Sequence, residues 1–265
     1  MTLIQIIVLA LIQGLTEFLP VSSSAHLILG SKVFGWPDQG LVFDVATHLG
    51  TLVAVFIYFR NELLEMVKAW TGPVSNEADR QHRNMAVYLM LASIPALFVG
   101  ALAHDLVEFY LRDVRIIAWT TIGFGLLLWI ADARGSRELS LKQINLRSAL
   151  LIGLAQAFAL IPGASRSGVT ITAGRFLGLT PDAAARFSFL LAIPVIGAAG
   201  GYGALRVITG DAGIDWIQFV LAMALSAAAG WVCIAAFLAL LKRVGLMPFV
   251  IYRLVLGLAL LWIVW

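Results

Sequence analysis

Long runs of apolar residues, separated by short polar segments, dominate the chain. A helix needs about 20 consecutive apolar residues to cross the hydrocarbon core of a bilayer. The runs of this length are residues 41–59, 84–103, 115–132, 183–202, 216–241 and 247–265. The pattern therefore predicts an all-α polytopic membrane protein with these six spanning helices.

Two further apolar regions, residues 3–34 and 148–178, are each interrupted by a polar stretch. The interruptions fall at residues 18–26 and 161–170, and each contains a proline and several serines. This pattern predicts two short helices joined by a polar turn, which is typical of a re-entrant helix pair. Non-helical backbone at membrane depth is stable only where it is buried in protein or lines a water-filled cavity. Both turns are therefore expected inside the protein.

The two interrupted regions resemble each other. Gln13 is followed by Pro20 and a serine cluster, and Gln156 is followed by Pro162 and a second serine cluster. Each region also precedes three of the predicted spans, so we expect two repeats of a re-entrant pair plus three spanning helices. The expected repeats cover about residues 1–132 and 148–265 of a single integral membrane domain, residues 1–265.

Basic residues indicate which loops lie on the cytoplasmic side. Cytoplasmic loops carry an excess of Lys and Arg, and three of the polar connections are rich in them. Placing these three connections inside makes the first re-entrant pair enter from the outer side and the second from the inner side. The repeats are therefore predicted to be inverted, and such folds bind substrates where broken helices meet near the midplane. The basic residues are Arg60, Lys68, Arg80, Arg83, Arg134, Arg137, Lys142, Arg147, Lys242 and Arg243.

Composition agrees with a membrane protein. Hydrophobic residues make up 61% of the 265 residues and charged residues only 12%, whereas a soluble domain carries about 25% charged residues. The net charge of +3 comes from basic residues in loops, which suits membrane orientation rather than nucleic-acid binding. The single cysteine, Cys233, rules out an internal disulfide within this sequence.

The first interrupted region holds one cluster of candidate functional residues. Burying an ionisable group in a membrane costs at least about 2.5 kcal/mol, so such groups are functional candidates. Gln13 and Glu17 are four residues apart and share one face of a helix. Pro20 ends that helix, and the serines can cap the next one. The other members of this cluster are Ser22, Ser23, Ser24 and His26.

The second interrupted region holds a cluster suited to an anion. Gly163 and Gly168 allow close approach to the backbone, and Arg166 supplies a planar fork that matches phosphate. A helix N-terminus also favours an anion. Facing helix N-termini, an arginine and several hydroxyls predict a diphosphate-binding site. The hydroxyls come from Ser165, Ser167 and Thr170.

Structural roles are the alternative for these polar residues. Serine turns often act only as helix caps, and Glu17 could simply neutralise Arg166. Four further candidates in the apolar segments are expected to be structural or to face lipid headgroups. They are His48, Arg175, Arg186 and Arg253.

The two motifs, residues 13–26 and 162–170, closely resemble those of the bacterial undecaprenyl-diphosphate phosphatase family, also called bacitracin-resistance proteins. Residues 44–51 and 186–194 are also similar to segments of this family, and the resemblance covers essentially the whole chain. Gln13 stands where some members have glutamate, so Gln13 is not expected to be an obligatory acid or base.

The resemblance implies hydrolysis of undecaprenyl diphosphate to undecaprenyl phosphate and inorganic phosphate, which recycles the lipid carrier for cell-wall synthesis and confers resistance to bacitracin. It implies dependence on a divalent cation, Mg²⁺ or Ca²⁺. It also implies a multi-pass protein of the bacterial inner membrane whose site opens to the periplasmic side, and which can form homodimers.

Catalytic roles are expected for Glu17, Ser23, His26 and Arg166. Ser23 is the preferred nucleophile, activated by His26 or Glu17, while water or His26 remain alternative nucleophiles. As an alternative to acting as the base, Glu17, together with Gln13, would hold the metal ion. The residues expected to bind the substrate are Gln13, Ser22, Gly163, Ser165, Ser167 and Thr170.

A lipid-phosphate flippase without hydrolysis is the competing function, because inverted repeats with broken helices are also a transporter architecture. A base beside a hydroxyl favours the hydrolase, since a carrier has less use for one.

Overall fold

The computed structural model describes residues 1–37, 39–111, 113–209 and 214–264, with residues 28, 30–34 and 104–110 described by their backbone alone. Within these residues the chain is helical, apart from turns and one isolated bridge between Leu139 and Leu179. The helices are α1 (Leu3–Glu17), α2 (Ser23–Phe34), α3 (Gly40–Tyr58), α4 (Arg60–Thr71), α5 (Glu77–Tyr110), α6 (Val114–Arg134), η1 (Leu141–Gln143), α7 (Leu146–Gln156), η2 (Ala157–Leu160), α8 (Arg166–Phe176), α9 (Pro181–Thr209), α10 (Trp216–Val244) and α11 (Met247–Val264).

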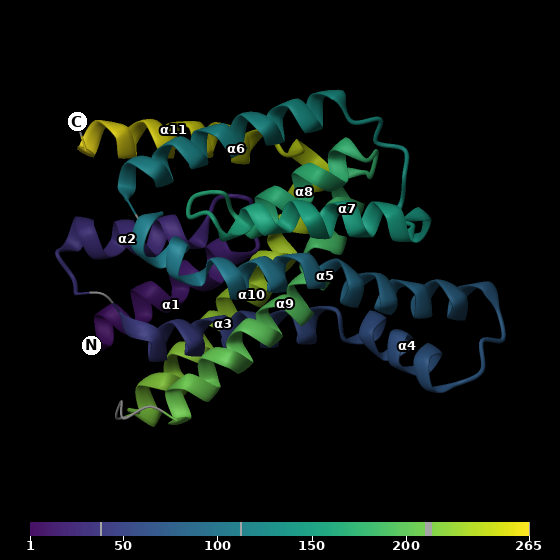
Figure 1. The fold of residues 1–265 in the computed structure, drawn as a ribbon, viewed down its shortest axis with the longest axis horizontal. Coiled ribbons are helices and arrows are strands. Elements are labelled where there is room, and N and C mark those ends of the chain that lie inside the picture. The colour runs from purple at the N-terminus through teal and green to yellow at the C-terminus, as the bar shows by residue number, and fades with distance from the viewer. Residues whose placement is uncertain (38, 112, 210–213, 265) are drawn as a thin grey trace.

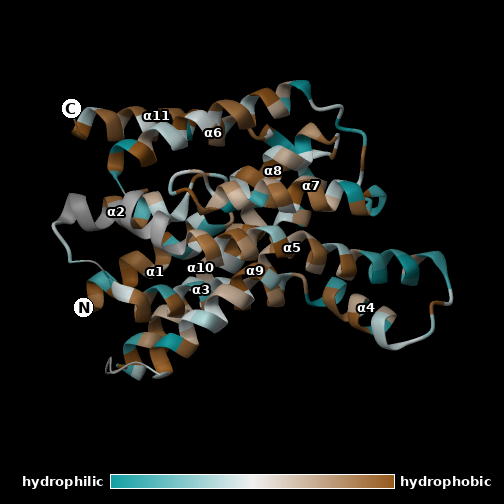
Figure 2. Cartoon of the chain, viewed as in Figure 1, coloured by the Kyte–Doolittle hydropathy of each residue, from teal (hydrophilic) through white to brown (hydrophobic). Residues whose placement is uncertain are grey.

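Six helices among the described residues are long and apolar enough to cross a membrane: α3, α5, α6, α9, α10 and α11. They coincide with the six predicted spans, which confirms an all-α polytopic architecture. Hydrophobic residues run along these helices, whereas the first turns of α5 and the start of α7 are hydrophilic (Figure 2). Both chain ends lie at one end of the molecule, and α4 lies at the opposite end (Figure 1).

The segment 60–83 differs from the expected loop. It contains the helix α4 and the first turns of α5, whose start is capped by the side chain of Asn76 accepting from the Asp79 N–H at 2.9 Å. The apolar-run criterion missed both, because these stretches are polar enough to lack a hydrophobic signal while still containing good helix formers.

The interrupted regions each form two short helices in contact, as predicted: α1 with α2, and α7 with α8. The turns between them meet in space, because the Ser167 hydroxyl donates to the carbonyl of Leu19 at 2.8 Å. Small residues let the first helix of each pair approach a spanning helix closely. A Cβ added at Gly14 would lie 2.6 Å from Ala229 of α10, and one at Gly153 would overlap with the backbone of Ala92 in α5.

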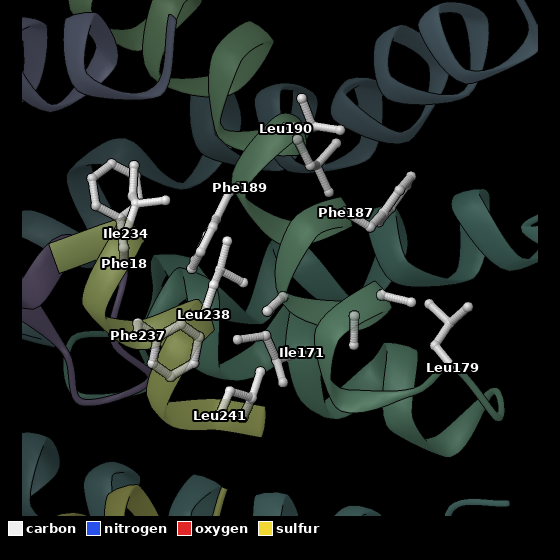
Figure 3. Packing of buried hydrophobic residues seen from close by; sticks show 14 of the residues in the cluster. Phe18, Ile171, Leu179, Phe187, Phe189, Leu190, Ile234, Phe237, Leu238 and Leu241 are labelled. Carbon is white, nitrogen blue, oxygen red and sulfur yellow. The ribbon is translucent and has the colours of Figure 1, made fainter. Parts of the chain in front are cut away.

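An aromatic cluster lies beside the turns (Figure 3). The rings of Phe18 and Phe189 are 5.4 Å apart and nearly perpendicular, and Phe189 and Phe237 are 5.7 Å apart. Edge-to-face pairs of this kind stabilise beyond the area that they bury. Phe18 directly follows Glu17 and Phe189 directly follows Ser188, so this packing fixes the backbone at both residues.

Candidate active site

Glu17 is the last residue of α1 and is 8% exposed. Gln13, one turn earlier and fully buried, donates its amide Nε2 to Glu17 Oε2 at 3.0 Å. The two residues therefore share a helix face, as their spacing predicts. The amide oxygen Oε1 of Gln13 is buried and has no hydrogen-bond partner among the described residues. The amide nitrogen of Gln13, and not its oxygen, therefore faces the carboxylate.

The serine turn brings a hydroxyl to this carboxylate. Ser22 has a φ of +75°, which turns the chain sharply into α2, and its hydroxyl lies 3.1 Å from that of Ser24. Ser23 then projects back toward α1 and donates its Oγ to Glu17 Oε2 at 2.9 Å. Of the two bases considered for Ser23, Glu17 is the one in hydrogen-bond contact with it.

His26 faces away from this contact. Its Nδ1 lies 2.6 Å from the Ser22 carbonyl, and its Nε2 lies 2.5 Å from the Tyr252 hydroxyl on α11. Both ring nitrogens therefore have partners other than Ser23. His26 therefore lies in the same turn region as Ser23, on the side that faces α11.

Arg166 joins the two motifs. It is the first residue of α8, and its guanidinium donates to Glu17 Oε1 at 3.0 Å and to the Ser188 carbonyl at 2.9 Å. The side chains of Arg166 and Glu17 are only 12% and 7% exposed. Such a partly desolvated pair is stronger than one at a surface. The facing arrangement predicted for the motifs is therefore present.

The hydroxyls of the second motif organise α8. Ser165 has a φ of +71° and caps the helix, accepting from the Gly168 N–H at 3.1 Å. The Ser165 and Ser167 hydroxyls are 3.2 Å apart. Thr170 is buried and donates to the Ser188 hydroxyl at 2.7 Å. These residues hold the helix N-terminus in place, and their expected contact with phosphate stays a prediction.

Gly163 has a φ of +89°, and an added Cβ would overlap with Thr120 and with the carbonyl of Ile117 in α6. Close packing against α6 is a sufficient reason for glycine at this position. The carbonyls of Pro162 and Gly163 accept from the hydroxyls of Thr120 at 2.6 Å and Thr121 at 3.4 Å, respectively. Both threonines support the turn from a spanning helix, and no motif marked them in the sequence.

Arg253 connects the two turns. It is fully buried and donates to the carbonyls of Pro20 at 3.1 Å, Gly163 at 2.9 Å and Thr121 at 3.1 Å. Its contacts are to backbone, in line with the expected structural role. Arg175 is also structural, since it is buried and pairs with Asp132 at 3.0 Å.

The other two candidates outside the motifs also contact protein groups. Arg186 pairs with Asp182 at 3.1 Å and with Glu62 at 3.3 Å. His48 places its Nδ1 2.8 Å from the Asp44 carbonyl. Sequence reasoning missed Ser188 and Tyr252, because each is a single polar residue within an apolar span.

The arrangement combines four chemical features. A hydroxyl contacts a carboxylate, the same carboxylate pairs with a guanidinium, and the helices α2 and α8 both begin beside them. Helix N-termini and arginine favour phosphate. A carboxylate in contact with a hydroxyl is the geometry of a general base and its nucleophile. The site is thus suited to phosphoryl transfer rather than to phosphate binding alone.

A divalent cation would have to rely on few protein ligands here. Among the described residues, no group of three or more His, Cys, Asp or Glu side chains is placed to hold a metal. Mg²⁺ is often bound by one or two carboxylates together with substrate phosphates. Glu17 fits that kind of site. Gln13 would add a ligand only with its amide turned so that Oε1, which has no hydrogen-bond partner among the described residues, replaces Nε2 beside Glu17.

Comparison with known proteins agrees with this geometry. The chain is 52% identical over 257 residues to an undecaprenyl-diphosphatase of Teredinibacter turnerae, with 97% of each chain covered. It is 52% identical to undecaprenyl-diphosphatase 1 of Pseudoalteromonas translucida, with 98% of each covered, and 50% identical to the enzyme of Colwellia psychrerythraea over the full length of both. The family model for bacitracin resistance protein BacA matches residues 6–259. The chain therefore belongs to the BacA family of bacitracin resistance proteins.

Proposed function

We propose that this protein hydrolyses undecaprenyl diphosphate to undecaprenyl phosphate and inorganic phosphate. This reaction recycles the lipid carrier for cell-wall synthesis and confers resistance to bacitracin. The contact of Ser23 with Glu17, which itself pairs with Arg166, is the observation that carries the proposal. The relatives at about 50% identity are named for the same reaction.

The first chemical step is attack of Ser23 on the terminal phosphorus. The Ser23 Oγ–P bond forms while the bond from phosphorus to the bridging oxygen breaks, and undecaprenyl phosphate leaves with the electron pair. Glu17 accepts the Ser23 proton through the hydrogen bond already formed at 2.9 Å. Phosphoryl transfer depends mainly on positioning and on neutralising charge, and Arg166 with the N-terminus of α8 supplies both.

The second step releases phosphate. Water attacks the phosphorus of the phosphoserine, and the Ser23 Oγ–P bond breaks. Glu17, protonated in the first step, returns its proton to Ser23 Oγ through the same hydrogen bond and so regenerates the hydroxyl. Both protons of the attacking water leave on the inorganic phosphate. A direct attack by water, with Ser23 only binding phosphate, is the alternative route and predicts residual turnover without Ser23.

A divalent cation, Mg²⁺ or Ca²⁺, is the proposed cofactor. Glu17 would hold it, together with the amide oxygen of Gln13 once that amide turns its oxygen toward Glu17, because hard cations prefer oxygen ligands. When bound, the cation would neutralise negative charge on the diphosphate.

The proposed architecture is two inverted repeats. Two features of the described residues support it. Ser22 and Ser165 both have positive φ and directly precede the second helix of their pair. The first helix of each pair packs on a spanning helix of the other proposed repeat, α1 on α10 at Gly14 and α7 on α5 at Gly153.

The proposed setting is the bacterial inner membrane, with the site open to the periplasmic side and the protein able to form homodimers. Labelling of single cysteines at Ser24 and at Arg80 by a membrane-impermeant thiol reagent in intact spheroplasts tests the orientation. Labelling of the Ser24 position alone supports it, and labelling of the Arg80 position alone contradicts it. Light scattering of the purified protein in detergent measures the oligomeric state.

Phosphate release from undecaprenyl diphosphate by purified protein tests the function. The reaction is run with Mg²⁺, with Ca²⁺ and with EDTA. Cation-dependent release by wild type supports the proposal, whereas well-folded wild type that releases no phosphate with any cation contradicts it. In that case a lipid-flipping assay tests the competing function, in which the same phosphate site carries the lipid across the membrane.

A further inference from the structure

Tyr252 places a polar group where an apolar one would normally lie. It belongs to α11, and its side chain is 44% exposed on an outward face that it shares with Ile251 and Val255, 56% and 61% exposed. A hydroxyl facing hydrocarbon without a partner is costly. The partner of this hydroxyl is His26, whose Nε2 lies 2.5 Å away.

The two rings lie edge to edge. Their planes are only 8° apart and their centroids are 5.7 Å apart, while the hydroxyl lies 2.5 Å from Nε2, too close for one ring to lie over the other. Phenylalanine would fill nearly the same space but could not make this hydrogen bond. The choice of tyrosine therefore points to the hydroxyl.

The two hydrogen bonds of His26 select one tautomer. The Ser22 carbonyl, 2.6 Å from Nδ1, can only accept a hydrogen bond, so Nδ1 carries a proton. In the neutral ring Nε2 is then an acceptor, and the Tyr252 hydroxyl donates to it. The ring is held at both nitrogens, and its Nε2 is directed toward α11.

The site has a buried end and an open end. Glu17 and Arg166 are 7% and 12% exposed, while Tyr252 is 44% exposed on the lipid-facing helix. The apolar tail of a lipid diphosphate must reach the lipid, so its terminal phosphate occupies the buried end. The phosphate attached to the tail then lies toward His26 and Tyr252.

We propose that Tyr252 is a positioning residue for the hydrolysis of the lipid diphosphate. Its hydroxyl holds His26 in the tautomer protonated at Nδ1, with the ring fixed at the open end of the site where the tail-linked phosphate arrives. This inference rests on the proposed function. It leaves activation of Ser23 to Glu17, because both ring nitrogens of His26 are occupied by the Ser22 carbonyl and the Tyr252 hydroxyl.

Turnover by Tyr252→Phe tests the role in catalysis. This variant keeps the aromatic ring and removes one hydrogen bond, so kcat should fall about fivefold while KM changes less than twofold. Tyr202→Phe is the matched control, because Tyr202 is also a half-exposed tyrosine on a spanning helix, 61% exposed, and it should behave as wild type.

A double-mutant cycle tests whether Tyr252 acts through His26. In a His26→Ala background, Tyr252→Phe should cause no further loss of turnover. A further loss by the same factor would show that Tyr252 acts independently of His26 and would overturn the proposal.

A measurement without substrate separates this inference from the proposed function. Diethyl pyrocarbonate modifies an unprotonated imidazole nitrogen, and Tyr252→Phe frees the Nε2 lone pair of His26. Modification of His26 should be several times faster in this variant than in wild type, with His48 as the internal reference and Tyr202→Phe unchanged. Equal rates in wild type and Tyr252→Phe would overturn the proposal even if the protein hydrolyses the lipid.

The wild-type protein provides a test that does not depend on a variant folding. Selective ¹⁵N labelling of histidine distinguishes the two neutral tautomers by chemical shift, and His26→Ala assigns the signal among the four histidines. The Nδ1-protonated form is expected for His26, and the Nε2-protonated form would contradict the proposal.

Discussion

Arg166 and Glu17 form an ion pair at 3.0 Å although 149 residues separate them in the chain. The pair joins the N-terminus of α8 to the C-terminus of α1, so each motif completes the other. Before substrate binds, the carboxylate satisfies the guanidinium. A diphosphate supplies a stronger anion for Arg166, which would leave Glu17 free to act on the Ser23 proton.

Replacing the carboxylate of Glu17 should slow the chemical step without removing the other contacts that bind the substrate. Glu17→Gln keeps the size and hydrogen-bonding capacity of the side chain but cannot accept the Ser23 proton. General-base catalysis contributes about 10²- to 10⁴-fold, so phosphate release should fall by at least roughly a hundredfold. The measurement is initial-rate phosphate release at saturating substrate and cation.

The same substitution also removes one partner of a buried pair, which costs about 3–5 kcal/mol in soluble proteins. The charge-neutral double variant Glu17→Gln/Arg166→Met should regain thermal stability relative to Glu17→Gln while staying inactive. Recovery of activity along with stability would show that Glu17 is a structural partner and not a base.

Ser23→Ala should abolish nearly all turnover, because it removes the hydroxyl that contacts Glu17. The neighbouring Ser24→Ala is the matched control, since the Ser24 hydroxyl contacts only that of Ser22 in the structure, at 3.1 Å. Phosphate release should stay within about threefold of wild type in the control, as expected for one lost hydrogen bond. Substantial turnover by Ser23→Ala would favour water as the nucleophile.

Much of the fold follows from hydropathy because a spanning helix is recognised by a sum over about 20 residues. The prolines and serines that interrupt two apolar regions also locate the turns correctly. By contrast, α4 is short and amphipathic, and Met66 and Ala69 are its buried residues. Its apolar residues recur at helical spacing and form no long continuous run, so a criterion based on run length does not detect it.

Part of the site was also predictable from hydropathy, because polar residues stand out within apolar segments. Glu17, Ser23 and Arg166 are polar residues at membrane depth, where burial marks them as candidates, and the resemblance to a family supports them. The contact of His26 with Tyr252 joins residues 226 positions apart. A tyrosine in an apolar run also fits an ordinary interfacial residue, so only the tertiary structure distinguishes the two.

Gln13 should tune the requirement for a divalent cation. Its Oε1 has no hydrogen-bond partner among the described residues and would be available as a ligand once the amide turns, so Gln13→Leu should raise the cation concentration needed for half-maximal activity several-fold. Gln13→Glu adds a charged oxygen ligand and should lower that concentration. Titration of Mg²⁺ and of Ca²⁺ into EDTA-treated protein measures both effects, and an unchanged requirement in both variants would remove Gln13 from the cation site.

Close helix approach at Gly153 should be essential for stability. An added Cβ would overlap with the Ala92 backbone, so Gly153→Ala must push α7 away from α5 or distort one of them. Gly123→Ala in α6 is the control, since its Cβ would meet nothing within 4 Å. Thermal unfolding in detergent should show a midpoint lower by several degrees for Gly153→Ala alone.

Arg253 should hold the turn after α1 and the turn before α8 in their relative positions. Arg253→Met removes all its donors and leaves the carbonyls of Pro20, Gly163 and Thr121 without this partner. Each unsatisfied buried acceptor costs about 1–3 kcal/mol, so the unfolding midpoint should drop and activity should fall with it. Arg253→Lys retains the charge, but an ammonium lacks the planar fork that reaches three carbonyls, and it should rescue only part of the loss.

Arg243→Met, at an exposed position near the end of α10, should leave the midpoint unchanged. If Arg253→Met unfolds at the wild-type temperature and yet loses activity, the guanidinium must contact the substrate instead of supporting the turns.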